Sequence, residues 1–287
     1  MKKYLRSFDV CIVCALPEEA RAFLEAVRKL GGGTLEEHIS PRYQYSSRST
    51  MLKNNEDELL SLHISWLPRY GPQEMTLHLS HVLEECQPRF AIMTGICAGD
   101  SQHVQLGDLI VAERTFTYDN GKFKSDELGR NIHESDTMTY QLNANILQFV
   151  GLFDDWKLSV TRLKRPSSPP ATRLKRRGVR CYIKAMASGS AVRADNPFED
   201  VRMPVRGTIA IDMEGAAFGL VMSRHPQIPW LLSRASATML TLTKTMFITA
   251  TQLALPRSTR SVSSKPISLM RGYPDWISLH CWLANGS

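Results

Sequence analysis

The sequence predicts an α/β fold with a largely parallel or mixed β-sheet. Short apolar stretches of strand character, such as Asp9–Leu16 and Arg89–Thr94, alternate with segments of helical periodicity, such as Pro17–Leu30 and Pro72–Glu85. This alternation is typical of layered α/β proteins. The 287 residues suffice for one large domain or two small ones, and 43% are hydrophobic, so we expect a sizeable core.

In the first half of the chain, two helices separate the predicted strands. Pro17–Leu30 begins with two glutamates, which favour the positive end of a helix dipole, and three glycines at 31–33 end it. Pro72–Glu85 carries apolar residues at helical spacing. The strands predicted here are Asp9–Leu16, Tyr43–Lys53, Glu58–Leu67, Arg89–Thr94 and Leu106–Tyr118, with a glycine-containing turn at 95–99.

The second half continues the pattern on either side of a basic loop. The predicted helices are Tyr140–Leu152 and Gly215–Arg224, and the predicted strands are Val179–Ala187, Gly207–Asp212 and Ile228–Leu232. Residues 161–178 contain the repeat TRLKR twice around a Pro/Ser-rich spacer, which indicates a flexible surface loop. Clustered Lys/Arg attract polyanions. No aromatic residue interleaves these charges, so we favour the solvated loop over a nucleic-acid-binding arm.

Charge and residue counts exclude several classes of protein. Residues 161–180 and 233–287 carry local charges of +8 and +5, so the net charge of +7 conceals an otherwise acidic body. No run of eighteen apolar residues occurs, and the start lacks the apolar core of a signal peptide, so we expect a cytoplasmic protein without a membrane span.

The cysteines and histidines show no metal or disulfide pattern. The six cysteines are scattered, and Cys11 and Cys14 fall three positions apart on a predicted strand, so their side chains face opposite sides and we interpret them as buried core residues. The eight histidines lack the paired spacing of metal ligands, and no dinucleotide fingerprint is present. We therefore expect neither a metal nor a cofactor.

The most informative run is Thr208–Phe218, TIAIDMEGAAF. A strand ends at an acidic residue, Glu214, and small residues follow at a helix start. A carboxylate in that position can accept two hydrogen bonds from a vicinal diol, and such bonds are stronger than neutral ones. Met213 offers a soft surface for a sugar face. The alternative is an ordinary strand-to-helix junction with a solvated Glu214.

Five ordered segments together resemble the nucleoside phosphorylase and methylthioadenosine/S-adenosylhomocysteine nucleosidase superfamily. They are VCIVCALPEE (10–19), IMTGICAG (92–99), LGDLIVA (106–112), ASGSA (187–191) and IDMEGAA (211–217). The resemblance implies a single α/β domain over residues 8–232, in which a twisted mixed sheet, often a distorted barrel, is flanked by helices. It implies cleavage of the N-glycosidic bond of purine nucleosides and, in the intact family, a homo-oligomer.

The resemblance also implies residue roles. Glu214 would bind the ribose 2′ and 3′ hydroxyls, and Met213 would pack against the sugar. The base would lie beside Ser188, Gly189 and Val192. The ribose and the nucleophile would lie beside Thr94, Gly95 and Ile96. This assignment suits an oxocarbenium-like transition state, which needs a held diol, a nucleophile and an acid at the leaving base.

Water is favoured over phosphate as the nucleophile. Phosphorylases of this family often carry an Arg two residues before the glycine of the turn, where this chain has Met93. The hydrolytic branch has a catalytic Glu in the first strand-to-helix turn, and Glu18 aligns with it, with Glu19 as its neighbour. The alternative for Glu18 is a carboxylate that only stabilises the helix start. Phosphorolysis stays open, because Arg69 or Arg193 could bind phosphate.

The family's general acid is missing. It is an Asp in a run such as VKGVCDYAD, but no carboxylate occurs between Leu232 and Pro274. Codons exist for Leu232–Thr241 that, read from the third base of the first codon, spell LKGVCDYAD, and Leu242–Ala254 can likewise yield the family-like PDKDDVYHGYAAR. We infer that 233–287 is an aberrant, out-of-frame and poorly folded tail, and that this chain is impaired. A non-catalytic nucleoside-binding domain is the second hypothesis, after the nucleoside N-glycosidase.

Overall fold

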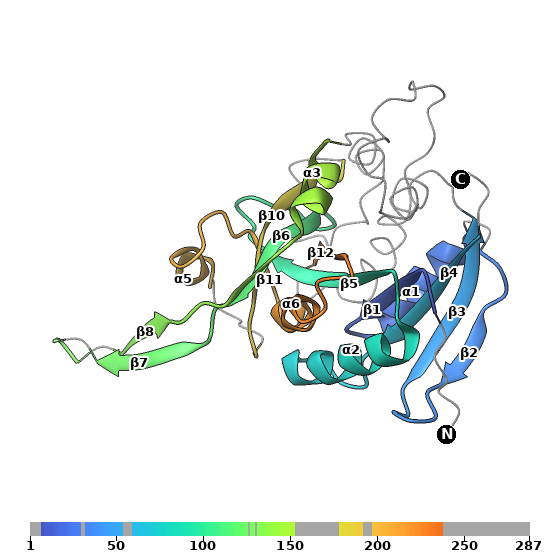
Figure 1. Cartoon of the computed structure of the whole chain (residues 1–287). Helices are drawn as coiled ribbons and strands as arrows, with labels where there is room; N and C mark the ends of the chain where they lie inside the picture. Colours follow the sequence, from blue (N-terminus) through green and yellow to red (C-terminus); the bar gives the residue numbers. More distant parts are fainter. Residues whose placement is uncertain are drawn as a thin grey trace.

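The structure, a computed structural model, describes residues 7–29, 32–53, 59–125, 127–129, 131–152, 178–191 and 197–237. Within these ranges it confirms the α/β class: a mixed sheet of ten strands with helices packed against it (Figure 1). The predictions for the basic loop at 161–177, for Val192 and Arg193, and for residues 238–287 concern residues outside these ranges.

The first part of the sheet is built around β1 (Val10–Cys14). This strand lies between β4 (Leu59–Trp66) and β5 (Phe90–Gly99) and runs parallel to both. All five of its residues are buried, as expected for a parallel strand covered on both faces. Two antiparallel strands, β3 (Ser46–Lys53) and β2 (Glu36–Ile39), extend this part of the sheet to its edge.

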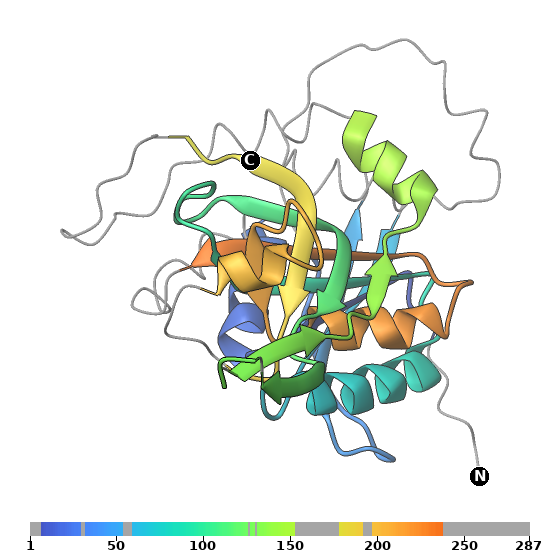
Figure 2. The same cartoon turned by 90° about the vertical axis from the view of Figure 1, so that its left-hand side faces the viewer.

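The second part of the sheet closes into a ring. From β5 the order runs through β12 (Trp230–Ala237), β6 (Leu109–Thr117), β10 (Cys181–Ser188) and β11 (Ala210–Asp212), and β11 pairs back onto β5. Figure 2 shows β6 and β10 side by side and pointing the same way, as their parallel register requires. The short β9 (Thr139–Gln141) adds to β6. The expected twisted mixed sheet of barrel-like form is thus present.

Three of the described helices lie close to their predicted positions: α1 (Pro17–Lys29), α2 (Pro72–Cys86) and α6 (Gly215–Ser223). The helix predicted from Tyr140 begins only at Ala144 as α3 (Ala144–Leu152), because Tyr140 pairs with β6 as part of β9. The short α5 (Phe198–Arg202) was not predicted from the sequence. α1 has its acids in the first turn and its bases in the last, and α2 has a proline in its first turn. α2 and α6 pack against each other (Figure 1). This contact brings the start of α2 beside the start of α6.

Several details differ from the sequence-based expectation. Residues 95–99 continue β5 rather than forming a turn, and the hairpin of β7 (Gly121–Ser125) and β8 (Asn131–Ser135) was not predicted. β12 runs to Ala237, five residues beyond the predicted domain boundary at 232, and its added residues pair with β5. No helix of the described ranges is long and apolar enough to cross a membrane.

Candidate active site

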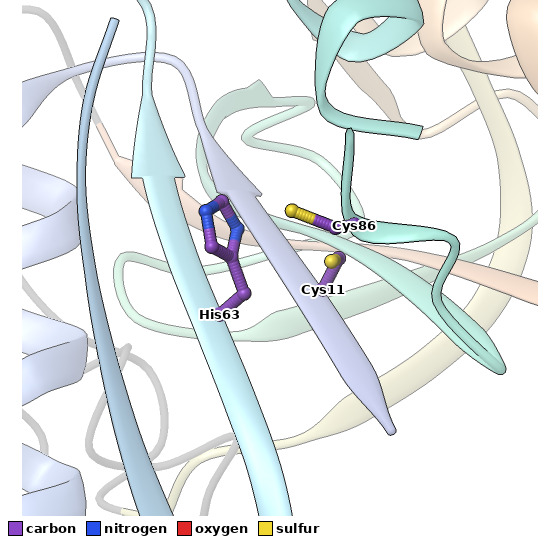
Figure 3. A group of neighbouring side chains, drawn as sticks. All are labelled: Cys11, His63 and Cys86. Atoms are coloured by element: carbon purple, nitrogen blue, oxygen red, sulfur yellow. The ribbon is translucent and has the colours of Figure 1, made fainter. Parts of the chain in front are cut away.

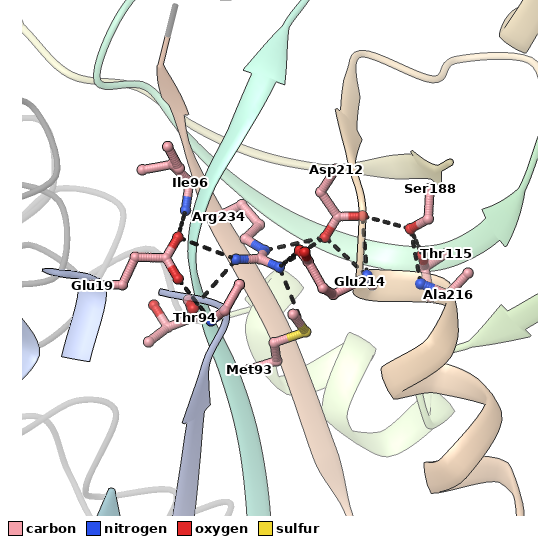
Figure 4. A network of polar contacts seen from close by, with 12 residues as sticks. Glu19, Met93, Thr94, Ile96, Thr115, Ser188, Asp212, Glu214, Ala216 and Arg234 are labelled. Atoms are coloured by element: carbon pink, nitrogen blue, oxygen red, sulfur yellow. Dashed lines mark hydrogen bonds and ion pairs between the residues drawn. The ribbon is translucent and has the colours of Figure 1, made fainter. Parts of the chain in front are cut away.

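A network of buried charged groups lies where α1, β5, β11, α6 and β12 meet (Figure 4). Three carboxylates, those of Glu19, Asp212 and Glu214, surround the guanidinium of Arg234. All four residues are at most 6% exposed. Burying a charged side chain is costly unless an opposite charge lies beside it. In this network the positive charge of the arginine compensates the negative charges of the carboxylates.

Glu214 occupies the position before the first residue of α6, and it is 4% exposed. Its Oε1 accepts a hydrogen bond from the backbone N–H of Gly71 at 3.0 Å, and its Oε2 lies 3.1 Å from Nη2 of Arg234. Burial raises the pKa of Glu214 to about 7, although Arg234 opposes the shift. Both oxygens therefore point into the protein interior rather than into bulk solvent.

Arg234 projects from β12 and is 0% exposed. Its Nη2 lies 3.1 Å from Asp212 Oδ2 and 3.1 Å from Glu214 Oε2, while its Nη1 lies 3.5 Å from Glu19 Oε1. Burial alone would lower the pKa of this guanidinium, but the three carboxylates together raise it. Arg234 thus stays charged at the centre of the network.

Asp212 ties the network to the base-side segment predicted from the sequence. Ser188 donates its hydroxyl to Asp212 Oδ1 at 2.5 Å and accepts the N–H of Ala216 at 2.8 Å. The N–H of Gly215 is 3.0 Å from both Asp212 oxygens. Asp212 therefore fixes the geometry of the strand-to-helix junction that presents Glu214.

The structure separates the two neighbouring glutamates of α1. Glu18 is exposed, and its Oε1 lies 3.6 Å from Nη1 of Arg21, which is one turn further along the helix surface. Glu19 is 2% exposed and accepts the N–H groups of Ala15 and Leu16 at 2.8 and 2.9 Å. Burial raises the pKa of Glu19. The role predicted for Glu18 stays a prediction, while the side chain that reaches the network is that of Glu19.

The predicted ribose-side segment lies beside this carboxylate. Ile96 donates its N–H to Glu19 Oε1 at 2.9 Å, and the carbonyl of Thr94 is 3.5 Å from Nη1 of Arg234. Gly95 has φ +150°, and a Cβ there would collide with both Glu19 and Arg234. A glycine is therefore required on conformational and steric grounds.

The remaining predicted residues sit around the junction. Gly189 donates its N–H to the carbonyl of Asp212 at 3.0 Å, and a Cβ at this glycine would clash with the ring of Tyr118. Met213 is partly exposed and precedes Glu214 directly. Met93, which stands where phosphorylases of this family often carry an arginine, is buried, and its sulfur lies 3.7 Å from Nη2 of Arg234.

A cavity of about 330 Å³ lies next to the segments that precede Glu19 and Gly71. It is lined by Ala15, Leu16, Pro17, Leu67, Pro68, Arg69 and Tyr70. The first two of these residues hold Glu19, and the last precedes Gly71, which holds Glu214. A small molecule in this cavity would therefore lie beside the backbone that positions two of the three carboxylates.

Sequence reasoning did not select Glu19, Asp212 or Arg234 as site residues. Helix phase gives a signal for Glu19: it lies on the same face of α1 as the buried Phe23, four residues later, while Glu18 shares its face with Arg21. Asp212 is the last residue of a buried strand next to Glu214. For Arg234 the chain carries no comparable signal, because its partners lie up to 215 positions away.

Comparison with known proteins gives a consistent picture. The model of the Phosphorylase superfamily matches residues 9–263. The uncharacterized protein y4jS of Sinorhizobium fredii strain NBRC 101917 / NGR234 is 26% identical over 238 residues, which are 79% of this chain and 54% of that protein. The chain thus spans about half the length of this curated relative.

Solved structures share the fold. A Helicobacter pylori 5′-methylthioadenosine/S-adenosyl homocysteine nucleosidase has a TM-score of 0.62 at 13% identity, covering 86% of this chain and 97% of that one. Futalosine hydrolase of the same organism has a TM-score of 0.60 at 14% identity, covering 87% of this chain and 96% of that one. A putative nucleosidase of Borrelia burgdorferi bound to adenine has a TM-score of 0.59 at 17% identity, covering 85% of this chain and 98% of that one. With the family model matching most of its length, the chain belongs to the phosphorylase superfamily.

Proposed function

We propose that this fold serves to cleave the N-glycosidic bond of a purine nucleoside, with Glu214 as the group that binds the ribose diol. The observation that carries the proposal is the buried carboxylate of Glu214 at the start of α6, whose Oε1 accepts the N–H of Gly71. Tyr70, the residue before Gly71, lines a cavity of about 330 Å³. The relatives of known structure include nucleosidases and one bound to adenine, which supports a purine nucleoside as substrate.

Hydrolysis is the favoured reaction, and Glu19 is the favoured group to activate water. Glu19 is buried at the network and burial raises its pKa, so this carboxylate is a better proton acceptor than an exposed one. Met93 offers no charge to a phosphate, whereas Arg69 at the cavity is the candidate for phosphate binding should the reaction be phosphorolytic. A requirement for added phosphate separates these two reactions.

The chain as it stands is proposed to be impaired, for two reasons. The segment that should carry the general acid has no carboxylate between Leu232 and Pro274, and loss of such an acid costs roughly 10²–10⁴-fold in rate. In addition, Arg234 already pairs with Glu214 Oε2, one of the two oxygens that a diol needs. Binding of a nucleoside therefore requires this ion pair to open.

The test compares the unaltered chain with a version in which residues 232–254 are replaced by the shifted-frame sequence LKGVCDYAD followed by PDKDDVYHGYAAR. Release of adenine from 5′-methylthioadenosine is measured in phosphate-free buffer, with and without added phosphate. We expect turnover without phosphate from the replaced version and little or none from the unaltered chain. Glu214→Gln in the replaced version is the control and should abolish turnover.

Four outcomes would contradict parts of this proposal. Full activity of the unaltered chain would remove the impairment, and dependence on phosphate would replace hydrolysis by phosphorolysis. If neither version cleaves any purine nucleoside but both bind one by calorimetry, the non-catalytic binding domain is the correct reading. Codons in the gene that are incompatible with LKGVCDYAD would end the reading-frame hypothesis.

A further inference from the structure

A second group of reactive side chains lies apart from the Arg234 network. Cys11 on β1, His63 on β4 and Cys86 at the end of α2 turn toward one another (Figure 3). One ligand atom from each lies within 4.8 Å of the others, and all three residues are buried. The chain positions 11, 63 and 86 form no sequence motif, so only the fold brings these groups together.

The sheet register and the helix explain the convergence. Cys11 and His63 are direct partners in the parallel pairing of β1 with β4, so their side chains leave the sheet on the same face. Cys86 is fixed nearby, because its carbonyl accepts the N–H of Phe8 at 3.2 Å, just before β1. These are rigid elements rather than loops, which suits a preformed site.

We propose that Cys11, His63 and Cys86 bind one divalent zinc-type ion. Thiolate sulfur and imidazole nitrogen are the ligands that Zn²⁺ prefers, at about 2.3 and 2.0–2.1 Å. Ligand atoms around such an ion stand roughly 3.5–4 Å apart. Movements of about 1 Å or less would bring the present arrangement to that geometry.

Charge balance selects a divalent ion. Two thiolates and a neutral imidazole around a 2+ ion give a neutral unit, whereas a monovalent ion would leave a buried negative charge. The surroundings are apolar and include Phe8 and Val82, so a neutral unit is strongly preferred there. Binding would release the protons of the two thiols to solvent.

Two further features point to a ligand at this position. Nδ1 of His63 is buried and has no hydrogen bond of ordinary geometry within the described ranges, although the imidazole interacts with the thiol of Cys86. A metal ion between these groups would give this nitrogen a strong partner. The hydroxyl of Tyr45 is 3.9 Å from the sulfur of Cys86, so it is a candidate for a fourth ligand. A zinc ion usually takes four ligands.

The site is independent of the proposed glycosidase chemistry. Cys14 lies on the other face of β1, where burial and the charge of Glu19 raise the pKa of its thiol. Cys11 instead belongs to the cluster with Tyr45 and Cys86. A metal here would hold β1, β4 and α2 together without contacting a nucleoside.

The experiment is a Co²⁺ titration of the untagged, reduced full-length chain, followed by absorption spectroscopy. We expect one ion per chain, a thiolate-to-cobalt charge-transfer band and displacement by Zn²⁺. Cys11→Ser and Cys86→Ser should each remove the band, and His63→Gln should weaken binding at least about tenfold. Cys97→Ser, at a buried cysteine outside the group, is the matched control and should bind as the unaltered chain does.

X-ray absorption at the zinc edge of the unaltered, zinc-loaded chain keeps the proposal testable if the variants do not fold. A first shell of sulfur and nitrogen supports the site, and a shell of oxygen and nitrogen alone overturns it. Absence of stoichiometric binding, or unchanged binding by Cys11→Ser, also overturns it. A Cys11–Cys86 disulfide that persists in reductant and excludes metal would replace the proposal with a structural cross-link.

Discussion

Replacing Arg234 by methionine tests the electrostatic account of the site most directly. The change keeps an unbranched side chain of similar length but removes the positive charge that faces Glu19, Asp212 and Glu214. Removing one member of a buried ion pair typically costs about 3–5 kcal/mol, because the remaining charge is left uncompensated. We expect a loss of unfolding free energy in that range for Arg234→Met.

The loss of the Arg234 charge should affect the three carboxylates to different extents. Asp212 keeps Ser188 and the N–H of Gly215, and Glu19 keeps three backbone N–H groups. Glu214 keeps only the N–H of Gly71 among its hydrogen bonds in the described ranges. Its pKa, already about 7, should therefore rise further in the variant. The cost of Arg234→Met should be larger at pH 8 than at pH 5, where this carboxyl holds its proton.

The assay is urea denaturation of both chains at pH 5, 6, 7 and 8. Glu214→Gln serves as the matched comparison, because it keeps an acceptor for Gly71 and leaves Arg234 with two carboxylates. It should cost about 1 kcal/mol or less at pH 8. A loss below about 1 kcal/mol for Arg234→Met at pH 8, or an equal loss for both variants, would refute the reasoning.

Three more predictions concern single residues. Gly95→Ala should lower the free energy of unfolding by about 1–3 kcal/mol, because the backbone has φ +150° and a Cβ would meet Glu19 and Arg234. Thermal unfolding measures this loss, and an unchanged midpoint temperature would contradict it. Glu19→Gln should lower the free energy of unfolding by about 1–3 kcal/mol, whereas the exposed Glu18→Gln should change it by no more than about 0.5 kcal/mol. If urea denaturation gives the reverse order, Glu19 is not the glutamate that belongs to the buried network. The pKa of Glu214 is raised from 4.5 to about 7 on folding, so its stabilising contribution is full below about pH 4.5 and is lost as pH rises through 7. Glu214→Gln should flatten this part of the stability profile, and an unaltered slope would exclude the shift.

Much of the fold could be predicted because its elements carry strong local signals. β1 is a continuous apolar run, α1 has charged residues matched to its ends, and α2 begins with a proline. The strand-to-helix junction at Asp212 and Glu214 was visible as a buried strand followed by small residues. Such signals come from residues that are close together in the sequence, so they can be recognised without knowledge of the tertiary structure.

Other features depend on distant partners and leave no local trace. Residues 95–99 read as a turn, yet pairing with β12 and β11 holds them in β5. The short β2, β7 and β8 are mostly exposed and lack an apolar pattern. The Cys11–His63–Cys86 group arises from register and helix packing, which the spacing of these residues does not encode.

The position of Arg234 has opposite effects on stability and on function: it stabilises the fold but hinders nucleoside binding. An unpaired arginine in the middle of a strand would be expelled from a core, but here it enters a region already rich in carboxylates. It stabilises those carboxylates, and for the same reason it occupies the Glu214 oxygen that a ribose diol would use. We therefore expect Arg234→Met to bind a nucleoside more tightly than the unaltered chain while being less stable. Calorimetry with 5′-methylthioadenosine at pH 8 measures this, with Glu214→Gln as the non-binding control. If tighter binding does not accompany the lost stability, Glu214 is not the group that holds the sugar.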